Sequence, residues 1–219
     1  MTVLLFISTI IVFLTIDYFV RRNKSVATVA QPIIRKAIPF RTPAGIFFTK
    51  SHTWLSLFPS GKVQLGVDDF VSRMFNTPSI TLLKNDREQV VRGEAILKMR
   101  EGKNEITVRS PINGTVEHVN TLLAKQPQLL NENLFSEGWA YTITPAKTDD
   151  LRSFFLGSET RTWLRDETGK LRDFFAHMTS SPEFAPIMMQ DGGLPANGVM
   201  NNLNPEQCRN FENQFLSVE

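Results

Sequence analysis

The spacing of apolar residues divides the chain into four parts. Residues 3–20, VLLFISTIIVFLTIDYFV, form a nearly unbroken apolar run, while residues 21–45 have no regular period and contain three prolines. Between residues 46 and 145, short runs of β-branched and aromatic residues alternate with turn residues. After residue 149, apolar residues recur three or four positions apart in several stretches, which an irregular segment interrupts. This order predicts an apolar N-terminal segment, a linker, a β domain and a helical C-terminal part.

The N-terminal apolar run is just long enough to cross a bilayer as a helix. The basic sequence RRNK follows it at residues 21–24, and Lys and Arg favour the cytoplasmic side. We therefore predict a single-pass anchor at residues 1–22 in the inner (plasma) membrane and a juxtamembrane linker at residues 23–45, with the rest of the chain facing the cytoplasm. A cleaved signal peptide is the alternative, because ATVA at residues 27–30 resembles a cleavage site.

The β domain is predicted from short β-prone runs bounded by turn residues. PSG at residues 59–61 and PING at residues 111–114 are hairpin-turn sequences, and Asp68 is a suitable N-cap for a helix at residues 68–75. Many short strands separated at regular intervals by turn residues predict a small sandwich or barrel. We expect strands at residues 45–50, 53–58, 62–67, 79–83, 90–99 with a break at Gly93, 104–111, 114–120 and 138–145.

The C-terminal part is predicted to be helical at residues 149–155 and 158–178. Residues 179–203 are rich in Pro and Gly and predict an irregular segment. A further helix begins with Asn204 as its N-cap and Pro205 in its first turn. The apolar stripe of the second helix consists of residues 163, 164, 171, 174, 175 and 178, and that of the last helix consists of Cys208, Phe211 and Phe215.

Composition excludes several classes of function. The net charge of +2 gives no strong attraction to nucleic acid. Cys208 is the one cysteine, so a disulfide framework or a cysteine-rich metal site is excluded, and we interpret it as a buried small side chain. The three histidines lack metal-ligand spacing, and the chain has no phosphate-binding glycine loop or GxSxG motif. We therefore expect neither a metal nor a catalytic constellation.

Four stretches resemble the H protein of the glycine cleavage system, a member of the lipoyl/biotinyl carrier fold. They are FTKSHTWL at 48–55, VQLGVDDFVSRMFN at 63–76, SPINGTVEHVNTLLAKQPQLLNENLFSEGWAYTI at 110–143 and DDLRSFFLGSETRTWL at 149–164. The resemblance implies a mainly β fold with added helices, built on a hammerhead-type β sandwich at residues 46–165. We predict two additions to this fold. They are the N-terminal transmembrane helix and a C-terminal helical extension at residues 166–219, which consists of a helix followed by an extended tail.

The resemblance also implies a site for lipoate at Lys103. In the family, a lysine at a tight turn lies ten residues after the glycine of a Gly-Glu pair and eight residues before the proline of a Ser-Pro pair. Gly93, Lys103 and Pro111 keep these intervals. Here Arg100 occupies a position where the family has an acid, and Glu101, one residue nearer the lysine, joins Lys103 as a candidate cofactor-binding residue. An unmodified, solvated turn lysine is therefore the alternative.

Two further residues enter through the same resemblance. His52 matches the family's Ser-His and is the candidate to shelter a loaded arm, with a hydrogen-bonded structural histidine as the alternative. Lys98, between Leu97 and Met99, is reminiscent of a biotin carrier, but it lies five residues before Lys103 and within a predicted strand.

Two functions from different classes are thus predicted. The first is a carrier whose lipoyl arm moves an aminomethyl group or electrons between partner enzymes of a glycine-cleavage-like or membrane complex. The second is a non-lipoylated accessory subunit that binds protein partners in an inner-membrane complex. Neither function includes catalysis by the chain itself.

Overall fold

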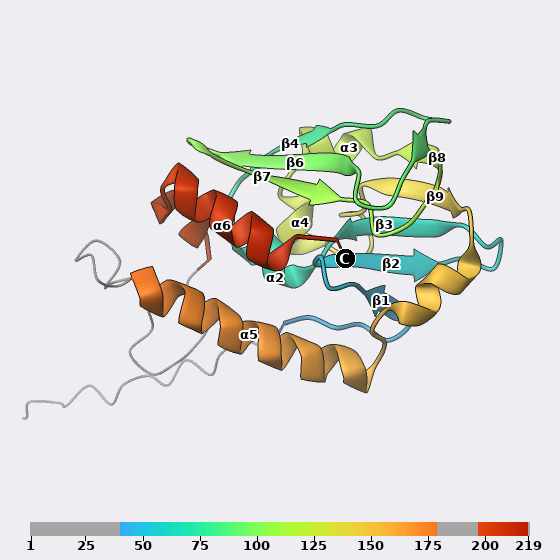
Figure 1. The fold of residues 1–219 in the computed structure, drawn as a ribbon. Coiled ribbons are helices and arrows are strands. Elements are labelled where there is room, and N and C mark those ends of the chain that lie inside the picture. The colour runs from blue at the N-terminus through green and yellow to red at the C-terminus, as the bar shows by residue number, and fades with distance from the viewer. Residues whose placement is uncertain (1–39, 179–196, 219) are drawn as a thin grey trace, which may run out of the picture. The chain divides into compact units, whose positions relative to one another are not determined.

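The computed structural model describes residues 40–178 and 197–218 (Figure 1). The predicted anchor at residues 1–22, most of the linker and residues 179–196 lie outside the described residues. Within the described ranges, no helix has the length and apolar character needed to span a membrane. The described chain consists of two antiparallel sheets with helices around them, which confirms the predicted β sandwich with added helices.

The larger sheet has six strands and the smaller one has three. The neighbouring strands of the larger sheet are β1 (Ile46–Phe48), β2 (Thr53–Leu57), β3 (Val63–Val67), β9 (Tyr141–Pro145), β8 (Gly114–Val119) and β5 (Gln89–Val90). Those of the smaller sheet are β4 (Ser79–Leu82), β6 (Ala95–Glu101) and β7 (Asn104–Arg109). Among the strands of residues 40–178 and 197–218, β7 lies at the edge of the smaller sheet, with β6 as its one strand neighbour.

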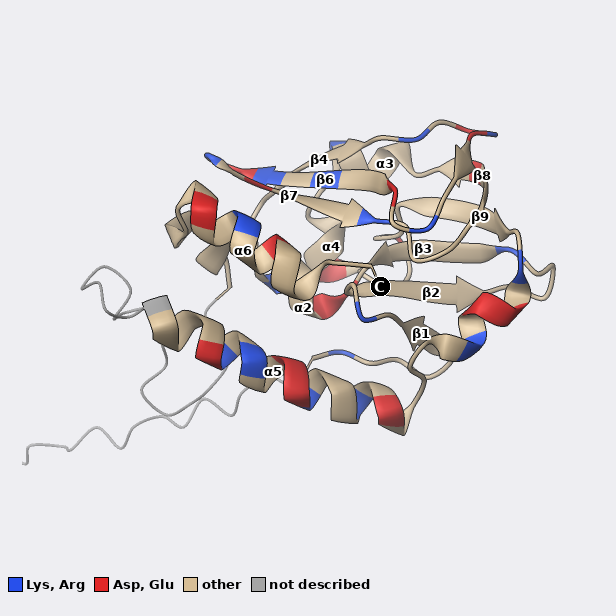
Figure 2. Cartoon of the chain, viewed as in Figure 1, with Lys and Arg blue, Asp and Glu red and all other residues tan. Residues whose placement is uncertain are grey.

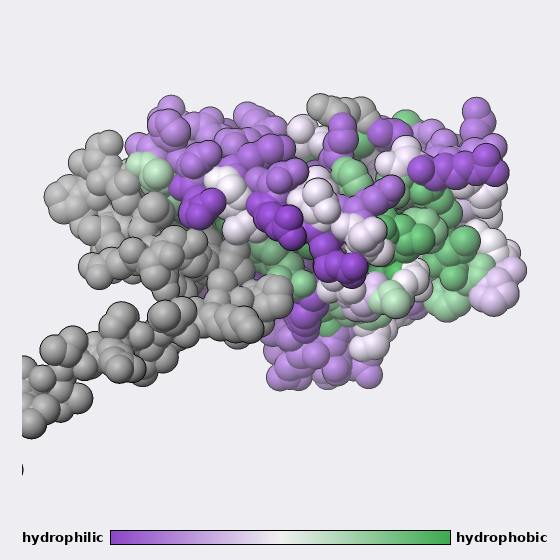
Figure 3. Space-filling view, turned by 90° about the horizontal axis from the view of Figure 1, so that it is seen from below, coloured by the Kyte–Doolittle hydropathy of each residue, from purple (hydrophilic) through white to green (hydrophobic). Residues whose placement is uncertain are grey.

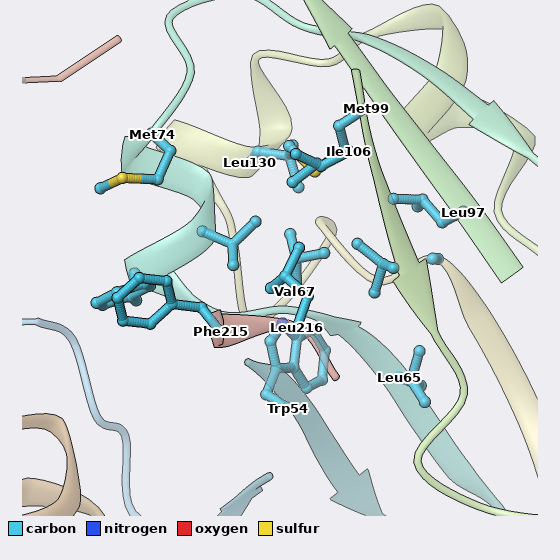
Figure 4. Packing of buried hydrophobic residues seen from close by; sticks show 14 of the residues in the cluster. Trp54, Leu65, Val67, Met74, Leu97, Met99, Ile106, Leu130, Phe215 and Leu216 are labelled. Carbon is cyan, nitrogen blue, oxygen red and sulfur yellow. The ribbon is translucent and has the colours of Figure 1, made fainter. Parts of the chain in front are cut away.

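The main core lies between the two sheets. Because side chains alternate across a strand, one face of each sheet supplies the apolar layer. Leu65 of β3 and Met99 and Ile106 of the smaller sheet are buried there (Figure 4). The hydroxyl of Tyr141 joins the sheets, since it donates to the carbonyl of Ile96 at 2.5 Å.

The short helices follow from local capping and from tertiary pairing. Asp68 caps α2 (Asp69–Arg73) by accepting from the amide of Val71, as predicted. The predicted helix at residues 149–155 is instead a 3-10 helix, η1 (Thr148–Ser153), and the chain is extended after it. The reason is tertiary, because Phe155 forms a backbone bridge with Phe48 of β1. The remaining short helices are α3 (Thr121–Lys125) and α4 (Leu129–Glu132).

Two longer helices lie beside the sandwich (Figure 1). The predicted boundaries of α5 (Ser158–Met178) are confirmed. A capping box between Asn204 and Gln207 begins α6 (Pro205–Phe215), directly after the 3-10 helix η3 (Val199–Asn202). The predicted stripes are confirmed by the buried side chains Trp163, Leu164, Leu171, Phe174 and Phe175 of α5 and Cys208, Phe211 and Phe215 of α6, while the side chain of Met178 lies outside what the structure describes.

The described part of the face seen from below carries many polar residues, with an apolar region toward the right of the view (Figure 3). Large apolar side chains that are exposed include Leu57, Phe58 and Leu156. Single exposed apolar residues are common on protein surfaces and indicate no binding site by themselves.

Candidate functional site

Lys103 lies at the tip of the hairpin formed by β6 and β7. The two strands pair as far as Glu101 and Asn104, which leaves Gly102 and Lys103 as a two-residue loop. Gly102 has a φ of 61°, as expected for the first loop residue of a type II′ hairpin. The Lys103 side chain is exposed. The predicted placement of this lysine in a tight turn between two strands is therefore confirmed.

Both residues that flank the loop are held by side-chain hydrogen bonds. The carboxylate of Glu101 accepts from the backbone amides of Asn76 at 3.0 Å and Thr77 at 3.1 Å. On the other side, the side-chain amide of the buried Asn104 donates to two main-chain carbonyls of the C-terminal part. The root of Lys103 is thus fixed from both strands while its side chain projects into solvent. The Glu101 carboxylate serves this local structure, and a role in binding a cofactor stays a prediction.

Charged residues lie along both strands of the hairpin (Figure 2). Lys98 pairs with Thr107 in the middle of the strands, and its Nζ atom lies 2.6 Å from Oε1 of Glu105. Lys98 is therefore part of a strand and carries an ion pair, whereas an attached group needs a protruding lysine. Arg100 is exposed, with its Nε atom 3.4 Å from the carbonyl oxygen of Gly102.

His52 occupies a buried position between the sandwich and α5. Its φ of 56° lies in the left-handed region, which costs free energy for a residue with a Cβ atom and requires strong support from neighbours. The imidazole stacks on Phe70 at 3.9 Å and lies 4.9 Å from the ring of Trp163. Its Nδ1 atom is 2.8 Å from Oδ2 of Asp68.

The charges around His52 favour its protonated form. Burial by itself lowers the pKa of His52, but the charge and hydrogen bond of Asp68, together with Glu167, outweigh it and raise the pKa above its ordinary value. The Nε2 atom lies 3.8 Å from Oε2 of Glu167, at ion-pair distance but too far for a hydrogen bond. Burial raises the pKa of Glu167, but the nearby charge of His52 and the hydrogen bond and charge of Lys170 lower it overall.

The structure does not bring His52 to the exposed surface around Lys103. The His52 side chain has no exposed surface, so a group attached at Lys103 could contact it only if side chains around the imidazole moved. The contacts of His52 are those of a structural histidine at the start of β2. A role in sheltering an arm stays a prediction.

Three residues of these clusters have roles that the sequence did not predict. Asp68 was predicted only as an N-cap, and Asn104 only as part of a strand. Glu167 could have been found, because it lies four residues from both Trp163 and Leu171 and therefore on the buried stripe of α5. No local pattern marks Asn104, whose partners lie 96 and 99 residues further along the chain.

Comparison with known proteins identifies the family. The family model for "Glycine cleavage H-protein" matches residues 46–167. The chain belongs to the glycine cleavage H-protein family. Members are lipoyl carriers and are not themselves catalysts, in agreement with the prediction that the chain is not an enzyme.

Similar proteins share this part of the chain. A glycine cleavage system H protein of Xanthomonas oryzae pv. oryzae is 30% identical over 103 residues, which cover 46% of this chain and 77% of that protein. A probable glycine cleavage system H protein of Thermococcus gammatolerans is 26% identical over 111 residues, covering 51% and 82%. The crystal structure of a glycine cleavage system H protein from Mycobacterium marinum has a TM-score of 0.47 and 21% identity, covering 53% of this chain and 94% of that one.

Proposed function

We propose that this protein is a lipoyl carrier whose arm is attached at Lys103. The observation that carries the proposal is the position of this lysine, which is exposed on a two-residue hairpin loop between two fixed residues. Membership of a family of lipoyl carriers supports the chemistry. The fit is physical as well, because an attaching enzyme needs a lysine that protrudes, and a carrier needs the root of its arm held still.

The protein would contribute by holding the root of the arm in a fixed position. When attached, a lipoyl group would supply the sulfur chemistry that accepts an aminomethyl group or electrons. The Lys103 Nζ atom would hold it through an amide at the end of a flexible four-carbon side chain. The hairpin confines the root, so the arm samples a small volume around the tip at high effective concentration for a docked partner enzyme.

We further propose that residues 1–22 anchor the protein in the inner membrane with its carrier domain facing the cytoplasm. The supporting observations are the apolar run at residues 3–20 and the RRNK sequence after it. In this arrangement the carrier would serve partner enzymes at the membrane.

A non-lipoylated accessory subunit is the second candidate function. Two observations favour it. Arg100 stands where the family has an acid, and the nearby acid Glu101 uses its carboxylate to bind backbone amides. An enzyme that recognises negative charge beside the lysine would find less of it here.

Mass spectrometry of protein from cells with working lipoate metabolism separates the two functions. The carrier predicts a lipoyl increment in the intact mass, mapped to Lys103. Lys103→Arg should remove the increment, because a guanidinium is not acylated in the same way, and Lys98→Arg is the matched control that should keep it. Unmodified wild-type protein would overturn the carrier and favour the accessory subunit.

A further inference from the structure

Part of the chain beyond the family match packs against the lysine hairpin. We call residues 197–218 the C-terminal segment; the family match ends at residue 167. In this segment, η3 lies at the hairpin tip, and α6 runs along the edge strand β7 (Figure 1). The lysine hairpin of this protein therefore has a neighbour that the matched family domain does not supply.

The contact nearest the lysine is made by Asn104. This residue follows Lys103 directly, is 1% exposed, and donates its side-chain amide to the carbonyls of Met200 at 2.6 Å and Leu203 at 2.7 Å. One side chain thus pairs two main-chain carbonyls of the C-terminal segment. On the surface beside it, Asn201 approaches Gly102, with its Oδ1 atom 3.9 Å from where a Cβ on that glycine would lie.

Contacts continue along β7 toward the base of the hairpin. The Cys208 thiol donates to the carbonyl of Glu105 at 3.2 Å. Further on, the backbone amide of Thr107 donates to the Glu212 carboxylate at 3.0 Å, so α6 pairs a main-chain group on the open edge of β7. An edge strand with one strand neighbour gains support from such contacts.

The C-terminal segment is also tied to the sandwich independently of the hairpin. The amides of Gly198 and Met200 donate to the carbonyls of Arg73 at 2.9 Å and Met74 at 3.0 Å, at the end of α2. The hairpin is thereby connected, through Asn104 and then η3, to the α2 end of the domain.

We propose that Asn104 is a positioning residue, through which the C-terminal segment holds the lysine turn in one geometry. The inference about turn geometry stands on these contacts alone; its consequence for modification rests on the proposed attachment of lipoate at Lys103. Without the side-chain amide of Asn104, the Leu203 carbonyl loses this hydrogen bond and the Met200 carbonyl keeps its 3.2 Å bond from the Leu203 amide, so the residue next to Lys103 is no longer tied to the C-terminal segment.

Two variants break this connection from opposite sides. Asn104→Ala removes the donor on the hairpin. Gly198→Ala acts on the segment, because a Cβ on Gly198 would collide with the side-chain amide of Asn76, and the φ of 77° disfavours a side chain. Ser79→Ala is the control, since it removes a 3.0 Å hydrogen bond to the carbonyl of Arg100 from β4, on the other side of β6.

The first measurement is amide exchange of the full chain, resolved by NMR at residues 101–105. Both variants should speed exchange there about tenfold, as expected from the loss of a buried hydrogen bond. In both variants, core amides such as that of Leu65 should exchange at the wild-type rate. The Ser79→Ala protein should exchange like wild type at residues 101–105. Because both variants cut one connection, the double variant should exchange little faster than either alone. Unchanged exchange at the tip in both single variants would overturn the proposal.

The second measurement is acylation of Lys103 by a lipoate–protein ligase, in which ATP adenylates the lipoyl carboxyl with release of pyrophosphate, and the Lys103 amine then displaces AMP and loses a proton as the amide forms. A loosened turn should raise KM for the carrier several-fold with little change in kcat, since fewer molecules present the recognised shape. If wild type is never acylated but tip exchange responds, the lipoyl function fails and the positioning role stands. If acylation is normal but tip exchange does not respond, the positioning role fails and the lipoyl function stands.

Discussion

The Nδ1 atom of His52 lies 2.8 Å from Oδ2 of Asp68, and both side chains are buried. The same Asp68 carboxylate caps α2, while Glu167 approaches the other side of the imidazole from α5. A histidine in the turn before β2 therefore links the sandwich to both helices. Its charge state should influence how firmly α5 is held.

We predict that this cluster makes stability depend on pH with a definite sign. Because the folded pKa of His52 is raised above 6.5, its contribution is fully present below pH 6.5 and is lost as pH rises through the folded pKa. The pKa of Glu167 is lowered from 4.5, so its contribution is present above that pH and is lost as pH falls through its folded pKa. Chemical unfolding measured between pH 4 and 9 (roughly, from reference pKa values) should show this dependence.

His52→Gln tests the assignment. The variant should lose about 1–3 kcal/mol of unfolding free energy near pH 6, the typical cost of breaking a charged buried hydrogen bond, and its stability should vary less with pH above 6.5. NMR titration of the imidazole in wild type gives the folded pKa directly. A value below that of an unfolded histidine would contradict the predicted sign.

Phe215→Ala should weaken the attachment of α6. The Phe215 ring lies 5.4 Å from Phe70, 5.8 Å from Phe174 and 4.9 Å from Phe211. Removing a buried ring of this kind costs about 3–5 kcal/mol, measurable as a lower midpoint of chemical unfolding. Asn213→Ala, at an exposed position of the same helix, should change stability little. Equal effects of the two substitutions would contradict the packing described here.

Two glycine substitutions should act in opposite directions. Gly169 lies inside α5 with space around it, so Gly169→Ala should stabilise the protein by about 0.5–1 kcal/mol. Gly102 has a φ of 61° at the hairpin tip, so Gly102→Ala should cost about 1–2 kcal/mol. Thermal unfolding of both variants checks the signs. A stabilising Gly102→Ala would show that the turn does not need the left-handed conformation.

The sequence predicted elements that depend on local signals. The hairpin tip, the N-cap Asp68 and the start of α6 at Pro205 each follow from residues within a few positions of one another. The 3-10 helix η1 was mispredicted because the pairing of Phe155 with Phe48 is a tertiary effect. For the same reason, the link from Asn104 to Met200 could not be predicted, since no local pattern encodes a contact across 96 residues.

Membrane topology is a separate prediction from the apolar run at residues 3–20 and the basic residues that follow it. A reporter that is active only outside the membrane, fused after Glu219, should be silent, because the positive-inside rule places the domain in the cytoplasm. N-terminal sequencing of the mature protein is the complementary measurement. Reporter activity, or processing near Ala30, would overturn the anchor.

Restoring an acid beside the turn should tell whether charge limits the modification of Lys103. Arg100 is exposed, and the carboxylate of Glu101 is engaged by the amides of Asn76 and Thr77. Arg100→Glu would thus place a solvated carboxylate where the family has one; it removes the 3.4 Å contact of Arg100 Nε with the Gly102 carbonyl but keeps the hydrogen bonds of Glu101 and Asn104. If the attaching enzyme reads negative charge there, kcat/KM for acylation should rise about tenfold, the effect of ~1.4 kcal/mol in binding.

Arg100→Gln separates the loss of a positive charge from the gain of a negative one. An intermediate rate for Gln and a higher rate for Glu would indicate a graded electrostatic effect, which added salt should reduce for exposed charges. Equal rates for wild type and both variants would contradict a role for charge. Recognition would then depend on turn shape, which Gly102 and Asn104 determine through the left-handed loop residue and the anchored strand.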